Sequence, residues 1–504
     1  MLFRSEDKAN RFLNVYRNRQ HQLFQFSGIE SPTIEDFKTY VSIPRDGQPG
    51  PNGIPYCAYR VVPELSSLVL HSTFQELCSS ESRIDLNSFN QTLVWFAPKG
   101  CEPGDNLAVN RSPGDLRTIF GGNTDSKIIS GVIGSKLTAA TLNVTPCLQR
   151  GFCRGRQLAL NVVDLDIYTR VYNTEFESSN PIRDIGSLPV TMLYDFANAF
   201  PSLCHQWMFK VLNILGIPVV YIKCIENLYR HINAYSSGVG TESFLFKVER
   251  GVKTGCPLSS VLFLLAINPF VFLFQWLSDG PSLSTTRVCA DDFGSALQKL
   301  SVLRIQHSIF QLAAPVAGLH LKPRKCVLIV SCVVLTQEII NAIRVWLRNN
   351  VPSFQDIDIA SSGKYIGWYL GQKDVERSFA APLLKFQERV SDIIEGAAPV
   401  FLAIQRFNQR AVSVLSYVSQ FSAPLVDLPA IAQVAVHKIL RLPPNSLSRE
   451  AVCAIKPFTG INPISLINYS RACLFRFAFS ERAYLFQLYK SIQDRCLESL
   501  PLCE

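Results

Sequence analysis

Apolar positions divide the first half of the chain into helices and strands. Apolar residues recur at spacings of three and four over 62–78, 126–143 and 203–233, which predicts helices with one buried face. Short continuous apolar runs bounded by turn residues predict buried strands over 93–98 and 188–195. This half of the chain should therefore mix helices with sheet.

The second half of the chain changes from mixed to helical. Residues 286–298 predict two short strands around a tight turn, because apolar residues flank an Asp-Asp pair and Asp favours turns. A helix is expected over 299–316, and a strand pair over 327–335 and 364–370. After residue 375 the apolar spacing is helical. This order predicts an α+β fold followed by an all-helical C-terminal region.

Length and composition support a folded protein of more than one domain. A chain of 504 residues exceeds the size at which one hydrophobic core usually stops growing. Hydrophobic residues make up 47% and charged residues 18%, a balance opposite to that of disordered chains. The formal net charge of +9 favours a polyanionic partner without identifying one.

One uncharged segment, 254–278, is long enough to span a bilayer. The alternative is a buried core helix. Asn268–Pro269 should break or kink a helix in the middle of this run, and no basic cluster flanks it. We therefore expect a core helix and no membrane partner.

The cysteines and the N-terminus bear on the compartment. The 15 cysteines include no C-x-x-C pair, and no Cys/His cluster has zinc spacing. The first ten residues are charged and no long apolar run follows, so no secretory signal is expected. We expect an intracellular protein of the nucleus or cytoplasm, neither secreted nor in a membrane.

Three aspartates are candidates for metal chemistry. Asp195 ends a predicted strand, and Asp291–Asp292 form the tip of the predicted hairpin. Two divalent ions about 4 Å apart can clamp the attacking and leaving oxygens of a phosphoryl transfer, and Mg²⁺ prefers carboxylate oxygens. Each part alone is weak, because a strand-terminal Asp is often a helix cap and an Asp-Asp turn is usually a solvated loop.

A series of motifs in the correct order resembles the reverse transcriptases of non-LTR retrotransposons. Coverage is good from about residue 45 to 372 and thin in the helical tail. The matching segments are GPNGIPYCAYR (50–60), WFAPKG (95–100), DLRTIFGGNTDSKIIS (115–130), QRGFCRGRQLALNV (149–162), LYDFANAFPSL (193–203), RGVKTGCPLSSVLFLL (250–265), VCADDFG (288–294), GLHLKPRKC (318–326) and KYIGWYLG (364–371).

The resemblance implies a right-hand polymerase fold and an activity. It implies an N-terminal basic extension (1–44), fingers and palm with an antiparallel palm sheet (45–372), and a helical thumb and C-terminal region (373–504). The activity implied is RNA-directed DNA polymerase, transferring nucleotides from dNTPs to the 3′-hydroxyl of a DNA primer on an RNA template. The cofactor implied is a pair of Mg²⁺ ions, for which Mn²⁺ can substitute.

Roles follow where the residues match. Asp195, Asp291 and Asp292 are expected to be catalytic and to ligate metal, together with the backbone carbonyl of Phe196. Lys325 is expected to protonate the leaving pyrophosphate.

Further residues are expected to bind the dNTP. Lys99 and Arg117 would neutralise the triphosphate. Phe200 would be an aromatic gate that rejects a 2′-hydroxyl, and Gly255 would let backbone approach the nucleotide. Ordinary surface charge, a core phenylalanine and a plain turn are the alternatives for these residues.

Clusters of basic residues are expected to contact nucleic-acid phosphates. Arg150, Arg154 and Arg156 lie in a Gly-containing turn, and Arg406 and Arg410 share a predicted helix face. An ordinary solvated face is the alternative for each cluster.

Several positions depart from the family pattern. Thr254 stands where Gln is usual, Cys289 replaces an aromatic, and Pro201 replaces an Asp. These departures favour one alternative, a catalytically decayed or repurposed fold that binds nucleic acid as a scaffold. The intact aspartates favour an active enzyme. No endonuclease segment is apparent before residue 45 and no zinc motif after 372, so endonuclease activity is expected to be absent from this chain.

Overall fold

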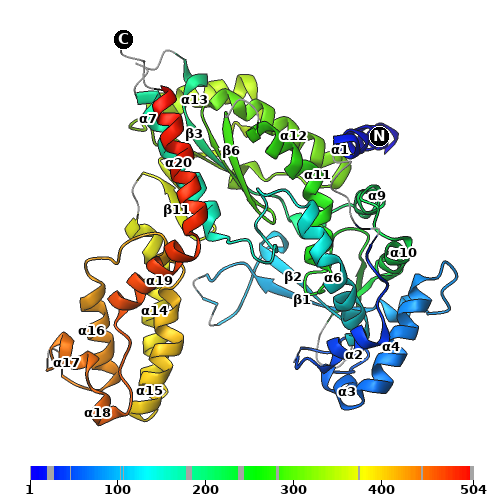
Figure 1. Ribbon diagram of the computed structural model, residues 1–504, viewed down its shortest axis with the longest axis horizontal. Coiled ribbons are helices and arrows are strands. Elements are labelled where there is room, and N and C mark those ends of the chain that lie inside the picture. Colours follow the sequence, from blue (N-terminus) through cyan, green and yellow to red (C-terminus); the bar gives the residue numbers. More distant parts are fainter. Residues whose placement is uncertain are drawn as a thin grey trace.

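The computed structural model gives the protein a palm sheet with helical lobes on two sides (Figure 1). The structure describes residues 2–19, 26, 28–45, 47–102, 104–105, 107–177, 184–236, 243–279, 283–372, 375–443 and 446–499.

The palm is a five-stranded sheet with the order β6-β7-β3-β8-β9. Its neighbours pair antiparallel, except that β8 and β9 are parallel. The expected antiparallel sheet is thus confirmed for four of the five strands. The strands are β3 (Val190–Tyr194), β6 (Ser284–Cys289), β7 (Asp292–Leu297), β8 (Val327–Ile329) and β9 (Asp358–Ala360).

The predicted pairing of 327–335 with 364–370 is wrong. The chain between them forms α13 (Gln337–Asn350) and then β9, which takes the place beside β8. The next two strands, β10 (Ser362–Tyr365) and β11 (Trp368–Gly371), pair only with each other. A short-range hairpin closes with little loop entropy, so it wins over the longer-range pairing.

A second sheet, with the order β2-β1-β4-β5, belongs to the fingers. Helices pack around it, and α6 and α10 contribute buried residues to the same core as the palm. The strands are β1 (Thr92–Pro98), β2 (Leu116–Gly122), β4 (Asn233–Ser236) and β5 (Phe244–Lys247). The helices of this half are α1 (Leu2–Arg19), α2 (Ile34–Ser42), α3 (Tyr56–Val61), α4 (Pro63–Cys78), α5 (Leu86–Phe89), α6 (Thr124–Val144), α7 (Ala159–Glu177), α8 (Ala199–Ser202), α9 (His205–Ile214) and α10 (Val219–Leu228).

The N-terminal segment predicted as a basic extension folds against the palm. Phe12 of α1 stacks on Trp207 and Phe270, with ring centroids 6.0 and 5.4 Å away. Leu13 and Tyr16 on the same face are buried. Lys8, Arg11 and Arg17 of α1 are exposed, on the outer face of a packed helix.

The apolar run forms α11 (Ser259–Asp279), which continues through Pro269. It is long and apolar enough to cross a membrane, as no other described helix is, and 67% of its most apolar window is buried. It contacts α6, α9, α12 (Leu303–Ala317) and β6. The described contacts therefore agree with the expected core helix.

The C-terminal third is helical, as predicted, and has its own core. Its helices are α14 (Val375–Glu395), α15 (Val400–Arg406), α16 (Leu428–Ile439), α17 (Arg449–Cys453), α18 (Lys456–Thr459), α19 (Leu466–Ser480) and α20 (Arg482–Ser499). Figure 1 shows α14 to α18 as a lobe facing the fingers helices, with α20 returning alongside α7. Val162, Leu165 and Tyr172 of α7 join the core of this lobe, which anchors it to the palm.

Candidate active site

The three aspartates lie at one end of two neighbouring palm strands. Asp195 follows β3 directly, and Asp292 opens β7. The register aligns Tyr194 with Phe293, so the next positions outward are Asp195 and Asp292. Asp291 lies in the turn that joins β6 to β7. The structure thus brings together the carboxylates that are 96 residues apart in sequence.

The carboxylates share one electrostatic environment. Burial, then the charge of Asp195, raises the pKa of Asp291. Burial, then the charges of Asp291 and Asp195, raises the pKa of Asp292 to about 6. Burial also raises the pKa of Asp195, while Lys325, Lys322 and Lys99 act in the opposite direction. Like charges in a partly desolvated cluster favour a bound cation.

This cluster should destabilise the metal-free fold. Because the folded-state pKa of Asp292 is raised, its charge opposes folding above about pH 6, and this penalty disappears below its unfolded-state pKa of about 4. We expect Asp292→Asn to raise the unfolding free energy at pH 7.5 by on the order of 1 kcal/mol, after discounting for the exposure of this side chain. Denaturant titrations in EDTA at pH 7.5 and pH 4 measure the difference. Asp358→Asn, on edge strand β9, is the control. An equal gain at both pH values would contradict the assignment.

The donors at this site fit a divalent ion that keeps water and substrate oxygens in its shell. Among the residues that the structure describes, no three His, Cys, Asp or Glu side chains lie close enough to hold a metal ion by themselves. Mg²⁺ commonly binds through one or two carboxylates plus phosphates and waters. None of the described residues donates a hydrogen bond to the Phe196 carbonyl oxygen, which remains available as a further hard donor.

A buried glutamine holds the hairpin that carries Asp291. Ala290 has a left-handed backbone, with φ of 57°. The Gln149 side chain accepts hydrogen bonds from the N–H groups of Ala290 and Gly151, each at 2.8 Å, and donates to the Ala290 carbonyl at 3.3 Å. A Cβ atom on Gly151 would lie 2.3 Å from the Ala290 nitrogen. Gln149 and Gly151 together fix a turn that would otherwise be strained.

Sequence reasoning missed this role of Gln149. Gln149 is the first residue of the segment 149–162, in which only the arginines were predicted to have a role. The signal that could have found it is a Gln two residues before a glycine, in a motif that gives this Gln no other role.

Gln149→Leu should therefore lower the rate of nucleotide addition by at least about tenfold, because a misplaced catalytic group loses rate steeply. A positioning role also predicts that more Mg²⁺ is needed for half-maximal rate. Steady-state extension over a range of Mg²⁺ concentrations measures both. Gln306→Leu is the matched control, since Gln306 is equally buried and bonds Tyr194 and Thr286 on the same sheet. An unchanged Mg²⁺ dependence for Gln149→Leu would leave Gln149 a purely structural residue.

One of the predicted dNTP-binding residues, Lys99, reaches the aspartate end of the palm from the fingers sheet. Lys99 follows β1, and its Nζ donates to the Asn198 side chain at 3.2 Å, three residues after Asp195. Gly255 has φ of 105°, and a Cβ there would lie 2.9 Å from the Phe120 carbonyl of β2. The Phe120 N–H also donates to the Thr254 carbonyl at 2.9 Å. The loop at 254–255 is thus seated on the fingers sheet.

Arg117 lies on β2 opposite Ala97, exposed and without a described hydrogen-bond partner. Its exposed guanidinium leaves it available to an anion, and its role stays a prediction.

The predicted gate residue is held in place by aromatic packing. The Phe200 ring stacks on Phe263 of α11, with centroids 4.2 Å apart and planes 10° apart. Phe152 meets Phe200 edge to face, with centroids 5.9 Å apart. Phe200 remains half-buried, so part of its ring is accessible. A fixed, partly accessible ring is what a steric gate requires.

Lys325 lies beside Asp195 in a short 3₁₀ turn, Pro323–Lys325. This turn is tied to the strand end, because the Lys322 N–H donates to the Asp195 carbonyl at 2.8 Å. The Lys325 side chain is exposed, and its charge is the largest of those that lower the pKa of Asp195. Its part in proton transfer stays a prediction.

For two arginines, Arg150 and Arg156, the expected contact with nucleic acid is wrong. Arg150 is buried and donates to Asp164, Asn161 and the Tyr484 hydroxyl at 2.7 to 3.0 Å. Arg156 donates to four backbone carbonyls near the end of α6. Both guanidiniums are used within the protein, so neither can grip phosphates.

The other basic residues remain candidates. Arg154 is exposed on the same turn. Arg406 and Arg410 lie in the C-terminal lobe, at the end of α15 and in the π-helical turn Phe407–Ala411 that follows. Their nucleic-acid role stays a prediction.

Comparison with known proteins agrees with the site. Residues 105–370 match the family described as reverse transcriptase (RNA-dependent DNA polymerase). The chain is 26% identical over 284 residues to the retrovirus-related Pol polyprotein from type-2 retrotransposable element R2DM of Drosophila melanogaster. That match covers 55% of this chain and 24% of the polyprotein.

Among solved structures, apo telomerase from Candida tropicalis aligns with a TM-score of 0.42 at 12% identity, over 82% of this chain and 70% of that one. The family match covers more than half of the chain and includes all three aspartates. The chain belongs to the reverse transcriptase (RNA-dependent DNA polymerase) family.

Proposed function

We propose that this chain is the RNA-directed DNA polymerase of a non-LTR retroelement, which extends a DNA primer on an RNA template with dNTPs and uses Mg²⁺. Family membership implies catalysis that depends on divalent metal ions and a bound template and primer. The observation that carries the proposal is the convergence of Asp195, Asp291 and Asp292 at one sheet end.

The residues divide the work of nucleotidyl transfer. When bound, divalent ions supply Lewis acidity for the attacking oxygen and charge neutralisation for the leaving pyrophosphate. Asp195, Asp291 and Asp292 would hold them, with the Phe196 carbonyl. Lys99 orients the triphosphate from the fingers, and Lys325 donates a proton to the departing pyrophosphate.

We propose an intracellular setting for this reaction, in the nucleus or cytoplasm. The twelve cysteines whose side chains the structure describes are all free thiols, which fits a reducing compartment.

The direct test is extension of oligo(dT) on poly(rA) with dTTP and either Mg²⁺ or Mn²⁺, beside Asp291→Ala. We expect extension by the wild type that the variant lacks. A soluble wild type that binds the primer–template and extends nothing with either metal would favour the decayed scaffold instead.

Phe200 provides a test of substrate choice. Phe200→Val should raise the ratio of ribonucleotide to deoxyribonucleotide incorporation by at least about tenfold, because the smaller side chain leaves room for a 2′-hydroxyl; tenfold corresponds to about 1.4 kcal/mol of discrimination. Competition between dTTP and UTP on the same primer measures the ratio. Phe401→Val, an exposed ring on α15, should leave the ratio unchanged. An unchanged ratio in Phe200→Val would remove this residue from the gate.

A further inference from the structure

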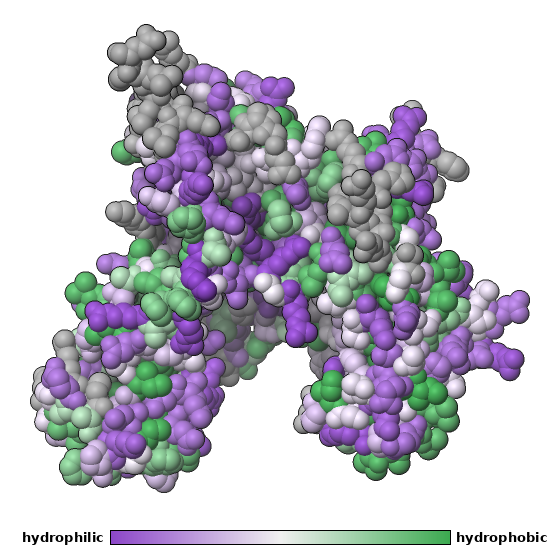
Figure 2. Space-filling view, in the orientation of Figure 1, coloured by the Kyte–Doolittle hydropathy of each residue, from purple (hydrophilic) through white to green (hydrophobic). Residues whose placement is uncertain are grey.

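Four exposed aromatic side chains form a stripe along α19 and α20. Phe475 and Phe479 of α19 are 70% and 58% exposed, and Phe486 and Tyr489 of α20 are 68% and 64% exposed. Their spacings of four, seven and three residues keep them on one helical face. Figure 2 shows pale green side chains among purple ones on the lobe that carries α19. These four rings are called the aromatic stripe below, and none of them belongs to the metal site.

The other faces of α19 and α20 are packed, so the aromatic stripe lies on a fixed surface. Phe477 of α19 is buried in a cluster with Leu160 of α7. The Tyr484 hydroxyl of α20 donates to the buried Asp164 carboxylate at 2.8 Å. A partner that binds the stripe therefore does not have to order these helices first.

The rings of the stripe contact one another and an arginine. Phe475 and Phe479 stack, with centroids 5.9 Å apart and planes 15° apart. The Arg482 guanidinium lies over the Phe479 ring, 4.5 Å from its centroid. An unpaired base binds by stacking on a free ring face, and these contacts already use faces of Phe479. Aromatic rings combined with arginine are instead typical of the residues that dominate protein–protein binding.

The charges beside the stripe are mostly positive. From residue 471 to residue 490 the chain has four basic residues and one acidic residue, Glu481. The Glu481 carboxylate accepts a hydrogen bond from Ser480 at 3.3 Å. The four basic side chains are exposed: Arg471, Arg476, Arg482 and Lys490. Charge complementarity therefore favours an acidic partner.

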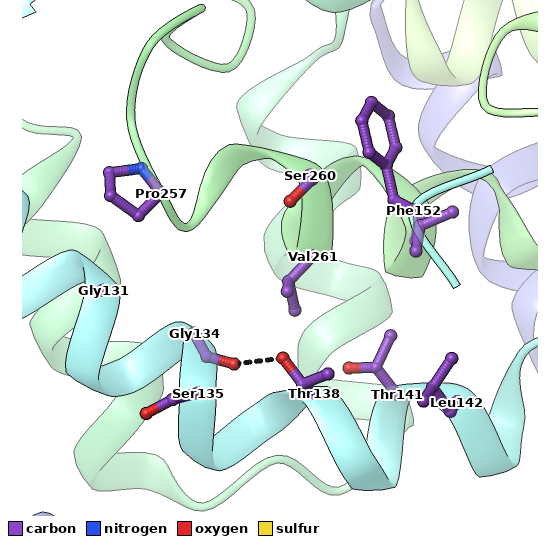
Figure 3. A pocket seen from close by; sticks show the side chains of 11 residues that line it. Gly131, Gly134, Ser135, Thr138, Thr141, Leu142, Phe152, Pro257, Ser260 and Val261 are labelled. Atoms are coloured by element: carbon purple, nitrogen blue, oxygen red, sulfur yellow. Dashed lines mark hydrogen bonds between the residues drawn. The ribbon is translucent and has the colours of Figure 1, made fainter. Parts of the chain in front are cut away.

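An open pocket of about 310 Å³ lies beside the stripe, lined by Arg476 and Ser480 of α19 and by Gln157 and Gln420. Arg476 is the one charged residue among those that line it. Its guanidinium has no hydrogen bond or ion pair with any residue that the structure describes. The cavity between α6 and α11 is smaller, about 180 Å³, and is lined by uncharged residues (Figure 3). A carboxylate fits the pocket at Arg476, because a guanidinium binds it through two parallel hydrogen bonds.

The area of the stripe selects among the acidic partners. Four rings that are about two-thirds exposed present on the order of 500 Å² of apolar surface. A stable dimer buries about 800 Å² on each partner, so a second copy of this chain would need more surface than the stripe offers. One amphipathic helix can cover a surface of this size. We propose that the aromatic stripe binds an acidic amphipathic helix of a partner protein, with its apolar residues on the rings and one carboxylate at Arg476.

The test uses a labelled synthetic peptide of about 18 residues, or five helical turns, with leucines on one face and glutamates on both sides of them. Fluorescence anisotropy with the full chain measures its affinity. Phe479→Ser and Phe486→Ser should each weaken binding by about tenfold, as the loss of a dominant interface residue does. Arg476→Gln should weaken binding and reduce its salt dependence, because one ion pair is lost. Phe458→Ser is the matched control, since this α18 ring is 91% exposed and lies outside the stripe.

Two altered peptides separate the contributions of charge and apolar surface. Replacement of every glutamate by lysine, or of every leucine by serine, should weaken binding to the wild-type chain by at least about tenfold. The proposal is overturned if the acidic peptide does not bind the wild type, if the lysine peptide binds equally well, or if Phe479→Ser and Arg476→Gln leave the affinity unchanged.

A primer–template decides between a protein and a nucleic acid as the occupant. Phe479→Ser should bind the primer–template with wild-type affinity, because the proposed site takes a peptide. The substituted side chains are exposed, so none of these variants should lose appreciable stability in denaturant unfolding. A stably folded Phe479→Ser protein that loses affinity for the primer–template would assign the stripe to nucleic acid and overturn the peptide site.

Discussion

Asp291→Asn should abolish primer extension, with a loss of at least about a thousandfold, while leaving the protein at least as stable as the wild type. The amide is close to isosteric but is a weaker metal donor. The charge it removes is one that burial and Asp195 already disfavour. Activity and stability should therefore move in opposite directions, which general misfolding cannot produce.

Single-turnover extension and denaturant unfolding measure these two effects. Asp166→Asn is the matched control, because Asp166 forms an exposed ion pair with Arg170 on α7. Surface pairs of this kind contribute little, so the control should change neither measurement appreciably. An Asp291→Asn protein whose extension rate is within tenfold of the wild-type rate would show that the hairpin is not a metal site.

Asp164→Ala should destabilise the protein by about 3–5 kcal/mol, the usual cost of leaving buried charges uncompensated. Asp164 is fully buried on α7 and accepts hydrogen bonds from Arg150, Arg287 and the Tyr484 hydroxyl. Removal of the Asp164 carboxylate leaves the guanidiniums of Arg150 and Arg287 without their anion. The same change frees α20, whose Tyr484 depends on that carboxylate.

Denaturant unfolding gives the first effect, and tryptic cleavage near Arg482 and Lys490 of α20 gives the second. Tyr484→Phe should cost only about 0.5–1.5 kcal/mol, since it removes hydrogen bonds and keeps the charges paired. Asp166→Ala is again the control. If Asp164→Ala lowered the unfolding free energy by less than Tyr484→Phe, the buried network would not hold the C-terminal helix on the palm.

The chemistry-bearing part of the fold was predictable because its residues follow local rules. A short apolar run that ends on Asp195 predicts a buried strand, and an Asp-Asp pair between apolar runs predicts a hairpin. Ordered motifs then placed the two at one site. The structure adds how the hairpin with Asp291 is held: Gln149 bonds to the left-handed Ala290. The spacing of apolar residues cannot predict a side chain that bonds to backbone far along the chain.

Long-range partnerships were not predictable. The 28 residues 330–357 separate β8 from β9, and nothing local selects the pairing of β8 with β9 over a pairing with β10. Arg150 and Arg154 look equivalent in sequence, yet one is buried against Asp164 and the other is exposed. Arg150 bonds to Asp164 of α7 and to Tyr484 of α20, a helix that returns to α7 and also pairs Arg495 with Glu175. The contacts of α20 with α7 join residues 320 positions apart, and the local spacing of apolar residues does not predict such contacts.

We propose that this palm copies RNA into DNA at the aspartate cluster. The most direct measurement is extension of a DNA primer on an RNA template of mixed sequence with all four dNTPs and Mg²⁺, followed by sequencing of the product. We predict a wild-type product complementary to the RNA and no product from Asp291→Asn. A product unrelated to the template, or an equal product from the variant, would show that the aspartate cluster does not catalyse RNA-templated DNA synthesis.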